Sequence, residues 1–422
     1  MKLPVKYVDR PFWMMYFALL IVAMIALFSA SSAEIFKHGS IFHTIGKQVF
    51  FWILGLGFVA VLQYIPSRLL RKSGFIFWVI SMILLYSLLI PHNPFAETHG
   101  EATRWFNLRP IGIPLTFQPS ELAKFSLVLL VADYLSRIET EEDGKKYFFL
   151  TLGITAVTIL PILPNNLSTC ILICGVVFIM WFLARVPWKY LLGIVSIVLA
   201  ILLSGYFYVE YAYIKPHVEI SSTHPLKRAV TWVGRVDAFL EQTDETDEEF
   251  EANMKDKDHY QRSLSNTAIV LGGKTPFGVF PGNSQERDFL PIAYADYIFA
   301  IMVEETGIVG AVFILFIYLA ILFSACYISS RYTDYGSMLM MMGMALMITC
   351  QALVSMAVAV GIGPVTGQPL PLISAGGTSA VITSLYFGFM FAVAREQKAL
   401  TDRQAQVQKS NINDIPEFNL EV

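Results

Sequence analysis

Asp296 is the residue with the clearest potential for chemistry, because it lies where a long apolar segment begins, within DFLPIAYADYIFAIMVEETG (288–307). A charged side chain at bilayer depth costs about 3 kcal/mol or more, so a carboxylate at this boundary needs a role that compensates. Glycines and prolines before it predict a shaped loop that leads into a helix, whose N-terminus favours the ionised acid. The residues alone leave open whether Asp296 is a helix cap or a reactive carboxylate. Farther along, Glu304 and Glu305 enter the apolar segment, and at least one is expected to face a bundle interior, paired with a cation or with backbone.

Cationic side chains form a second group. The stretch QPSELAK predicts a helix start with Ser120 as its N-cap, which puts Glu121 and Lys124 three residues apart on one face of the first turn. They could form a local ion pair, or Lys124 could face a cavity and meet an anion there. Arg104 and Arg109, in the preceding loop, add positive charge on the same side. Several cations on one surface would suit a pyrophosphate.

A third stretch, GPVTGQPLPLISAGGTS (363–379), contains three prolines and several glycines, which exclude a regular helix. Irregular backbone at membrane depth is tolerated only against protein or a water-lined cavity, so this stretch is either a rigid turn or part of a cavity wall. The seven histidines show no metal-ligand spacing, and no phosphate-binding glycine loop argues for ATP hydrolysis. No serine or cysteine nucleophile motif stands out.

The elements that carry these residues follow from composition. The chain has 422 residues, of which 55% are hydrophobic and 15% charged, and apolar runs of about 20 residues recur along it. We therefore expect an all-α polytopic membrane protein, with the first apolar run kept as a span. About ten spans are predicted to begin near Phe12, Gln48, Gly74, Ser120, Tyr147, Leu167, Leu191, Tyr297, Ser337 and Ser379.

Lysines and arginines in the short connections predict the orientation, because they gather on the cytoplasmic side of a membrane. With ten spans, all of these clusters fall on one side, which makes both termini cytoplasmic. The loop before QPSELAK, the turn ILPNNLST (162–169), the segment 211–296 and the stretch 363–379 then lie on the outer face. We predict a transmembrane domain over 1–398, whose large extracytoplasmic loop (211–296) contains a mobile acidic insertion (241–258). A polar cytoplasmic tail without regular structure is predicted over 399–422.

Taken together, these stretches resemble the SEDS family (shape, elongation, division and sporulation). The resemblance rests on TRWFNLRPIGIPLTFQPSELAK, RVDAFLE, FLPIAYADYIFAIMVEETGIVG and PVTGQPLPLISAGGTS, in that order along most of the chain. The chain departs from the family at Tyr294 and Ala295, where His-Thr is common, and at Ala375, where Tyr is common. Asn165 and Asn166 begin a stretch that is often Pro-Asp-Leu-Gly-Thr. The stretch FPGNSQ is closer to the division-type (FtsW-like) than to the elongation-type (RodA-like) pattern.

The resemblance implies a peptidoglycan glycosyltransferase that joins lipid II into glycan strands at the outer face of the cytoplasmic (inner) membrane, for septal wall synthesis. Asp296 matches the family's catalytic aspartate and would be the general base, while Lys124, Arg104 and Arg109 would receive the leaving pyrophosphate. The assigned substrate-binding residues are Arg104, Arg109, Gln118, Glu121, Lys124, Ser374, Gly376 and Gly377; the supporting residues are Glu304, Glu305, Pro369 and Pro371.

No cofactor or metal ligand is assigned, although a divalent cation (Mg²⁺ or Mn²⁺) could share the neutralising role. The implied partners are the lipid II substrate, a class B penicillin-binding protein with transpeptidase activity and other division-complex membrane proteins, but no nucleic acid. The alternatives are a RodA-like elongation polymerase, a noncatalytic lipid II flippase and a division scaffold. A flippase would need polar groups through the whole depth, whereas here they crowd the outer half. A secondary transporter would show an inverted repeat, and none is evident.

Overall fold

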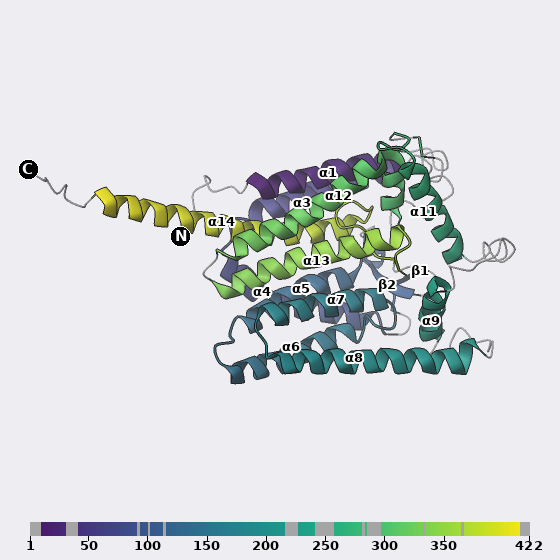
Figure 1. Cartoon of the computed structure of the whole chain (residues 1–422), viewed down its shortest axis with the longest axis horizontal. Helices are drawn as coiled ribbons and strands as arrows, with labels where there is room; N and C mark the ends of the chain where they lie inside the picture. Colours follow the sequence, from purple (N-terminus) through teal and green to yellow (C-terminus); the bar gives the residue numbers. More distant parts are fainter. Residues whose placement is uncertain are drawn as a thin grey trace, which may run out of the picture.

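The computed structural model describes residues 10–30, 41–90, 93–99, 102–112, 115–215, 227–240, 257–280, 283–284, 297–331, 334–363 and 367–413. These residues form a bundle of long helices with a small sheet at one end (Figure 1). Asp296 and residues 241–256 of the predicted acidic insertion lie outside the described residues, as does most of the segment 281–296.

Ten long helices occupy the ten predicted positions in the described chain. They are α1 (Arg10–Ala30), α3 (Ile41–Leu62), α4 (Ser67–Ser87), α5 (Pro119–Leu135), α6 (Glu141–Ile159), α7 (Leu167–Leu183), α8 (Trp188–Val209), α12 (Ile298–Ser329), α13 (Tyr335–Ala359) and α14 (Gly377–Asn413). Seven helices of the described chain are long and apolar enough to cross a membrane, namely all of these except α5, α6 and α7. The prediction of an all-α polytopic membrane protein is confirmed.

Local sequence signals explain where several helices begin. Asn166 caps α7 by accepting a hydrogen bond from the Thr169 backbone N–H, and Thr140 caps α6 in the same way. Pro119 is the first residue of α5, a position where its missing N–H and fixed φ fit the helix. The prediction that Ser120 is the N-cap of this helix was wrong, because Pro119 takes the first helical position and Gln118, two residues earlier than Ser120, is the N-cap.

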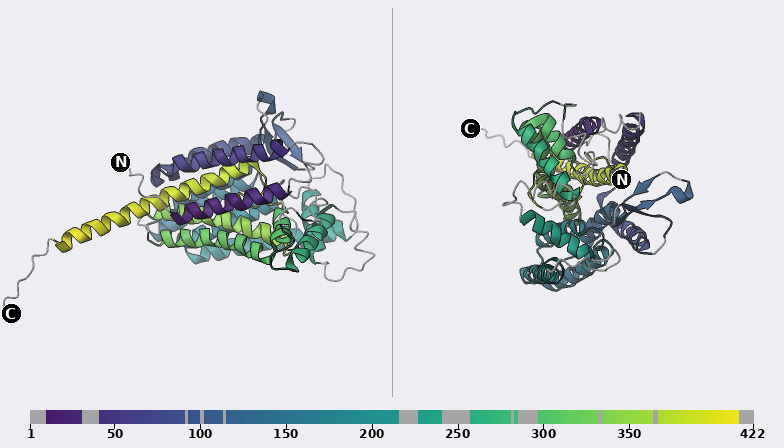
Figure 2. Two further views of the ribbon diagram at one scale, coloured as in Figure 1. Left: turned by 90° about the horizontal axis from the view of Figure 1, so that it is seen from above. Right: turned by 90° about the vertical axis from the view of Figure 1, so that its right-hand side faces the viewer.

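The helices run side by side, and α14 extends well beyond the others (Figure 2). The prediction of a tail without regular structure after Lys398 was wrong for the described part, since α14 continues to Asn413. Its last turns contain Ala, Arg, Gln and Lys, which are good helix formers even when solvent surrounds them.

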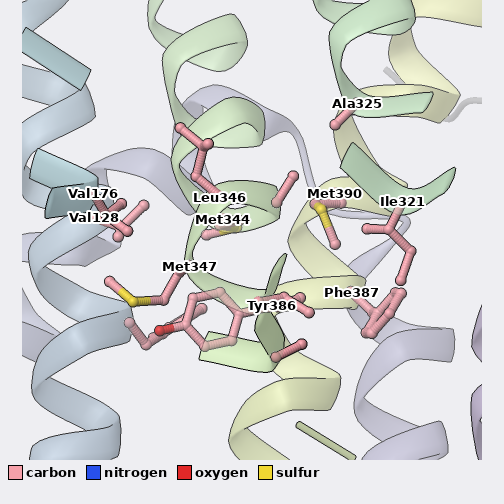
Figure 3. Close-up of a cluster of buried hydrophobic side chains, with 14 of the residues drawn as sticks. Val128, Val176, Ile321, Ala325, Met344, Leu346, Met347, Tyr386, Phe387 and Met390 are labelled. Atoms are coloured by element: carbon pink, nitrogen blue, oxygen red, sulfur yellow. The ribbon is translucent and has the colours of Figure 1, made fainter. Parts of the chain in front are cut away.

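Helix α5 lies at the centre of the bundle, whereas α8 lies at its edge. Fifteen of the 17 residues of α5 are buried, because α4, α6, α7, α13 and α14 surround it. In α8 only Leu191 and Val209 are buried. Figure 3 shows the core between α5, α7, α13, α12 and α14, where Val128, Val176 and Met347 come from the first three of these helices.

One end of the bundle, called the sheet end here, contains a small sheet. Its strands are β1 (Ala96–His99), β2 (Ala102–Asn107) and β3 (Thr116–Phe117). The three strands are antiparallel in the order β1-β2-β3. The Phe106 ring stacks on Phe95 and lies tilted against Phe117, with 5.3 Å between ring centroids in each pair. A 3₁₀ turn, η1 (Arg109–Ile111), links β2 to β3. The sequence predicted a loop here, and the sheet was missed; its pairing fixes where Arg104 and Gln118 lie.

Part of the predicted large loop is helical. A π-helical turn, η2 (Glu210–Ile214), ends α8, and two further helices follow, α9 (Lys227–Leu240) and α11 (Lys257–Gly273). In Figure 1 these helices lie at the sheet end, on the right, and α11 packs against α12. They therefore cover the end of the bundle at which α12 begins.

The charged end, opposite the sheet end, is held by buried ion pairs. Arg71 lies 3.1 Å from Asp133 and 3.0 Å from Asp334, and Arg137 also contacts Asp133. Asp334 caps α13 by accepting hydrogen bonds from the N–H and the hydroxyl of Ser337. Burial raises the pKa of Asp334, but the Ser337 hydrogen bonds and the Arg71 charge outweigh it, so the pKa lies below its ordinary value.

Candidate functional site

A pocket opens at the sheet end, between the end of α4, strand β2, the start of α5 and the turn from α6 to α7. Its space, including the open mouth, is about 300 Å³. The lining residues are Leu85, Leu88, Thr103, Arg104, Gln118, Ser120, Pro161, Ile162, Asn165 and Asn166. The pocket therefore has an apolar wall from α4 and the α6–α7 turn, and a polar wall from β2, the start of α5 and the two asparagines.

The polar wall combines one cation with uncharged hydrogen-bonding groups. Arg104 comes from β2, and Gln118 directly precedes α5, so pairing of β2 with β3 brings the two to one place. Ser120, in the first turn of α5, has a buried hydroxyl with no hydrogen-bond partner in the described residues. A buried hydroxyl without a partner marks a position that a ligand or water can fill.

Gln368 fastens the late loop (367–376) to the start of α7. Its side-chain nitrogen donates to Thr169 Oγ1 at 2.8 Å and to Ser168 Oγ at 3.2 Å. The same nitrogen lies 3.4 Å from Asn166 Oδ1, so the asparagine that caps α7 also lines the pocket and contacts the late loop. Two stretches 200 residues apart in sequence therefore meet beside the pocket.

Lys124 is fully buried and does not line the pocket. Its Nζ lies 2.7 Å from Glu121 Oε1 and donates to Gln351 Oε1 at 2.6 Å. Gln351 in turn donates to the Pro369 carbonyl at 3.0 Å. The local ion pair considered from the sequence is thus present, and its partners compensate the cost of burying the ammonium group. A role of Lys124 or Glu121 toward substrate stays a prediction.

Ser374 shapes the late loop from within. Its hydroxyl accepts the Leu370 N–H at 2.8 Å, while its own N–H donates to the Leu370 carbonyl. The Pro371 carbonyl accepts the Tyr318 hydroxyl at 2.6 Å. These bonds hold an irregular backbone against α12, as membrane-depth loops require.

Gly376 and Gly377 join the late loop to α14. A Cβ on Gly377 would lie 2.3 Å from the Phe51 ring, so this glycine permits close approach of α3 and α14. A Cβ on Gly376 would meet only an ordinary contact with Ser379. Neither glycine lines the pocket, and their predicted role in substrate binding stays a prediction.

The predicted acids and the remaining arginine lie away from the pocket. Glu304 and Glu305 are fully buried in α12, where they accept hydrogen bonds from the hydroxyls of Ser284 and Ser29. Sequence reasoning expected a cation or backbone partner and did not predict these serines. Arg109 is exposed in η1, and its backbone N–H donates to the Asn107 side chain.

Sequence reasoning also missed Ser120, Gln351 and Gln368 as elements of this region. The turn ILPNNLST and the motif GQPLP were the available signals, because each places amides beside proline-bent backbone. Among the described residues, no group of three or more His, Cys, Asp or Glu side chains could hold a metal ion. The divalent cation considered from the sequence stays a prediction.

Comparison with protein families gives a match along almost the whole chain. A family model for cell cycle proteins of the FtsW, RodA and SpoVE type matches residues 9–399.

Curated relatives match over similar lengths. A probable peptidoglycan glycosyltransferase FtsW from Saccharophagus degradans is 30% identical over 393 residues, which is 90% of each chain. One from Marinomonas mediterranea is 29% identical over 400 residues, 92% of this chain and 87% of that protein. The peptidoglycan glycosyltransferase MrdB of Escherichia coli is 26% identical over 398 residues, 94% of this chain and 95% of that protein.

Solved structures share the fold. A chain of a peptidoglycan synthase complex that coordinates polymerization and crosslinking superposes with a TM-score of 0.69 at 24% identity, over 93% of this chain and 99% of that one. The rod shape determining protein RodA of Thermus thermophilus superposes with a TM-score of 0.61 at 22% identity, over 93% and 98% of the two chains.

Proposed function

Because this chain belongs to the SEDS family of FtsW, RodA and SpoVE cell cycle proteins, we propose that it is a peptidoglycan glycosyltransferase. The observation that carries the proposal is the match over residues 9–399, together with relatives that bear this activity in their names and align over nine-tenths of both chains. The pocket at the sheet end supports the proposal, because the stretches QPSELAK and ILPNNLST line it and the late loop contacts its lining through Gln368.

The reaction is the transfer of one lipid-linked sugar unit to another. The 4-hydroxyl of the acceptor attacks the anomeric carbon of the donor, and a new C–O bond forms as the bond to the lipid pyrophosphate breaks. The bonding electrons leave with the pyrophosphate, and the hydroxyl proton passes to a carboxylate base. Asp296 is the proposed base, by its match to the family motif.

The leaving pyrophosphate is a stable anion that needs charge neutralisation more than a proton. Of the three cations predicted for this task, Arg104 alone lines the pocket, and Ser120 and Asn166 offer uncharged partners next to it. We therefore assign the pyrophosphate to Arg104. The apolar wall formed by Leu85 and Leu88 at the end of α4 suits the first carbons of a lipid chain.

The proposal places the sheet end on the outer face of the cytoplasmic membrane and both termini in the cytoplasm. The Lys and Arg distribution supports this orientation. Lipid II is the proposed substrate, and a class B penicillin-binding protein that crosslinks the new strands is the proposed partner. The likeness in fold to a chain of a synthase complex that coordinates polymerization and crosslinking supports that partner.

A role in septal wall synthesis is the first choice, because the FtsW relatives are the more similar in sequence. A role in elongation is the second, since MrdB also aligns over almost the whole of both chains, 94% of this one and 95% of its own. Complementation separates the two: a division-type protein restores septation to cells depleted of FtsW, whereas an elongation-type protein restores rod shape to cells depleted of MrdB.

The activity is tested by polymerisation of labelled lipid II by the purified chain with its transpeptidase partner. Wild type is compared with Asp296→Asn and with Glu141→Gln, a matched control at an exposed carboxylate in the first turn of α6. Polymer from wild type and the control, but not from Asp296→Asn, supports both activity and base. Equal polymer from all three removes Asp296 from the chemistry. If wild type makes none, transport of lipid II into liposomes tests the flippase alternative.

A further inference from the structure

The end of α11 and the segment that follows it (272–280) cross α12 where the helix is broken. Helix α12 contains one non-helical residue, Gly307, with φ 67° and ψ −165°, which divides it into a short first part (298–306) and a long second part (308–329). Residues 272–280 pass directly over this break. A helix break with positive φ in an apolar span requires partners for the backbone groups that it frees.

Glycines make the crossing possible, because no Cβ would fit between the two backbones. A Cβ on Gly278 would lie 2.4 Å from the Glu304 carbonyl oxygen, and Gly278 itself has φ +64°. A Cβ on Gly307 would lie 2.4 Å from the Pro276 carbonyl oxygen, and one on Gly272 would lie 2.1 Å from that of Val303. Positive φ and contact with backbone atoms both exclude side chains at Gly278 and Gly307.

Hydrogen bonds fix the crossing on both sides of the break. The Val279 N–H donates to the Glu304 carbonyl at 2.9 Å, before the break, and the Val309 N–H donates to the Pro276 carbonyl at 3.2 Å, after it. The Glu304 carboxylate also accepts the hydroxyl of Ser284, four residues beyond the crossing. The first part of α12 is therefore tied to residues 276–284 through backbone and side chain.

We propose that this crossing is a positioning device that sets the first part of α12 for catalysis, with Gly278, Gly307, Glu304 and Ser284 as positioning residues. The inference rests on the proposed function, in which Asp296 is the base. Asp296 precedes Ile298, the first residue of α12, by two positions in the sequence. Because Asp296 is joined to the first residue of α12 by one intervening residue, a shift or rotation of residues 298–306 should also displace the proposed base.

The proposed effect is on the chemical step and not on substrate affinity. The pocket that is proposed to hold the pyrophosphate is lined by residues of the chain before residue 167, and the crossing contributes none of them. A misplacement of about 1 Å in a catalytic group can cost about 100-fold in rate. A disturbed crossing should thus lower kcat while leaving KM for lipid II nearly unchanged.

The test compares Gly278→Ala with Gly273→Ala, a matched control on the same segment, where a Cβ would meet nothing within 4 Å. We expect Gly278→Ala to lower kcat about 100-fold, with KM within about twofold of wild type. Gly273→Ala should keep wild-type kinetics. Hydrogen exchange at the amides of 298–306, followed by mass spectrometry, should be faster in Gly278→Ala alone.

A milder pair of variants keeps the test valid if Gly278→Ala does not fold. Ser284→Ala removes the hydroxyl that binds Glu304, and Ser284→Thr keeps it, so the alanine variant should lose kcat and the threonine variant should retain it. Normal kcat in both Gly278→Ala and Ser284→Ala, in a preparation whose Asp296→Asn variant is inactive, would overturn the positioning role. A wild type that makes no polymer would instead count against the proposed function, while exchange still reports on the crossing.

Discussion

Replacing Lys124 by Met should destabilise the protein, because it strands a buried carboxylate. The ammonium group lies 2.7 Å from Glu121 and 2.6 Å from Gln351, and no part of the Lys124 side chain is exposed. Methionine fills a similar volume without charge, so packing is kept while Glu121 loses its cation. Removing one partner of a buried ion pair costs about 3–5 kcal/mol. With an unfolding entropy of about 2.1 cal/mol/K per residue, the melting temperature of this 422-residue chain in detergent should fall by about 3–6 °C.

The double variant Lys124→Met with Glu121→Gln separates structure from catalysis. Replacing both charges by neutral groups of similar size is often neutral for stability, so the double variant should recover most of the loss. Thermal unfolding and lipid II polymerisation are then measured on the same preparations. If stability and polymerisation both return, the Glu121–Lys124 pair is structural; if only stability returns, one of the two side chains acts on the substrate.

One result would refute this reasoning about the buried pair. If Lys124→Met is as stable as wild type, Glu121 tolerates burial without its cation, and the pair does not hold α5 to Gln351 of α13. The control for nonspecific loss of charge is Lys145→Met on α6, since that lysine is exposed.

Three further perturbations follow from the site and from the charged end. Ser120→Ala should leave the free energy of unfolding unchanged or raise it by about 1 kcal/mol. If the pocket holds substrate, KM for lipid II should rise up to about tenfold, and an unchanged KM would show that this hydroxyl does not contact the substrate. The pKa of Asp334 in the folded protein lies below its ordinary value of 3.8, so its ion pair adds stability that is fully present above pH 3.8 and is lost as the pH falls through the folded pKa. Asp334→Asn should therefore remove this contribution to the acid-side loss of stability, as measured by thermal melts between about pH 2 and pH 6. Gly377→Ala should cost about 1–3 kcal/mol through its clash with Phe51, and it should add little cost in a Phe51→Ala background, where the clash is absent. Gly376→Ala should show no comparable loss, so equal melting of the two glycine variants would contradict the packing.

The ten long helices could be predicted from the sequence because each is encoded by a local run of apolar residues long enough to form a buried or membrane-spanning helix. The Gln-Pro-Ser-Glu stretch likewise predicted a helix start. The cap was placed wrongly at Ser120 because Pro119 prefers the first helical position. The short strand β2 was missed because its stability comes from pairing with residues on both sides and not from a long alternating pattern.

The polar contacts of the site could not be predicted from local pattern. Gln368 and Thr169 lie 199 residues apart, and Lys124 and Gln351 lie 227 residues apart, so only the packed bundle brings each pair together. The crossing at Gly307 was hidden for the same reason: a glycine within an apolar run looks like any small residue until a second backbone is placed against it.

The burial of α5 on every side has a consequence for how the sequence of this protein can vary. A helix with one face toward lipid accepts almost any apolar replacement there, as α8 should over most of its length. Helix α5 has no such face, and each substitution on it meets a neighbouring helix, the Glu121–Lys124 pair or the Asp133 ion pairs. In a library of single variants selected for growth, the 17 residues of α5 should therefore accept the fewest replacements, and α8 the most.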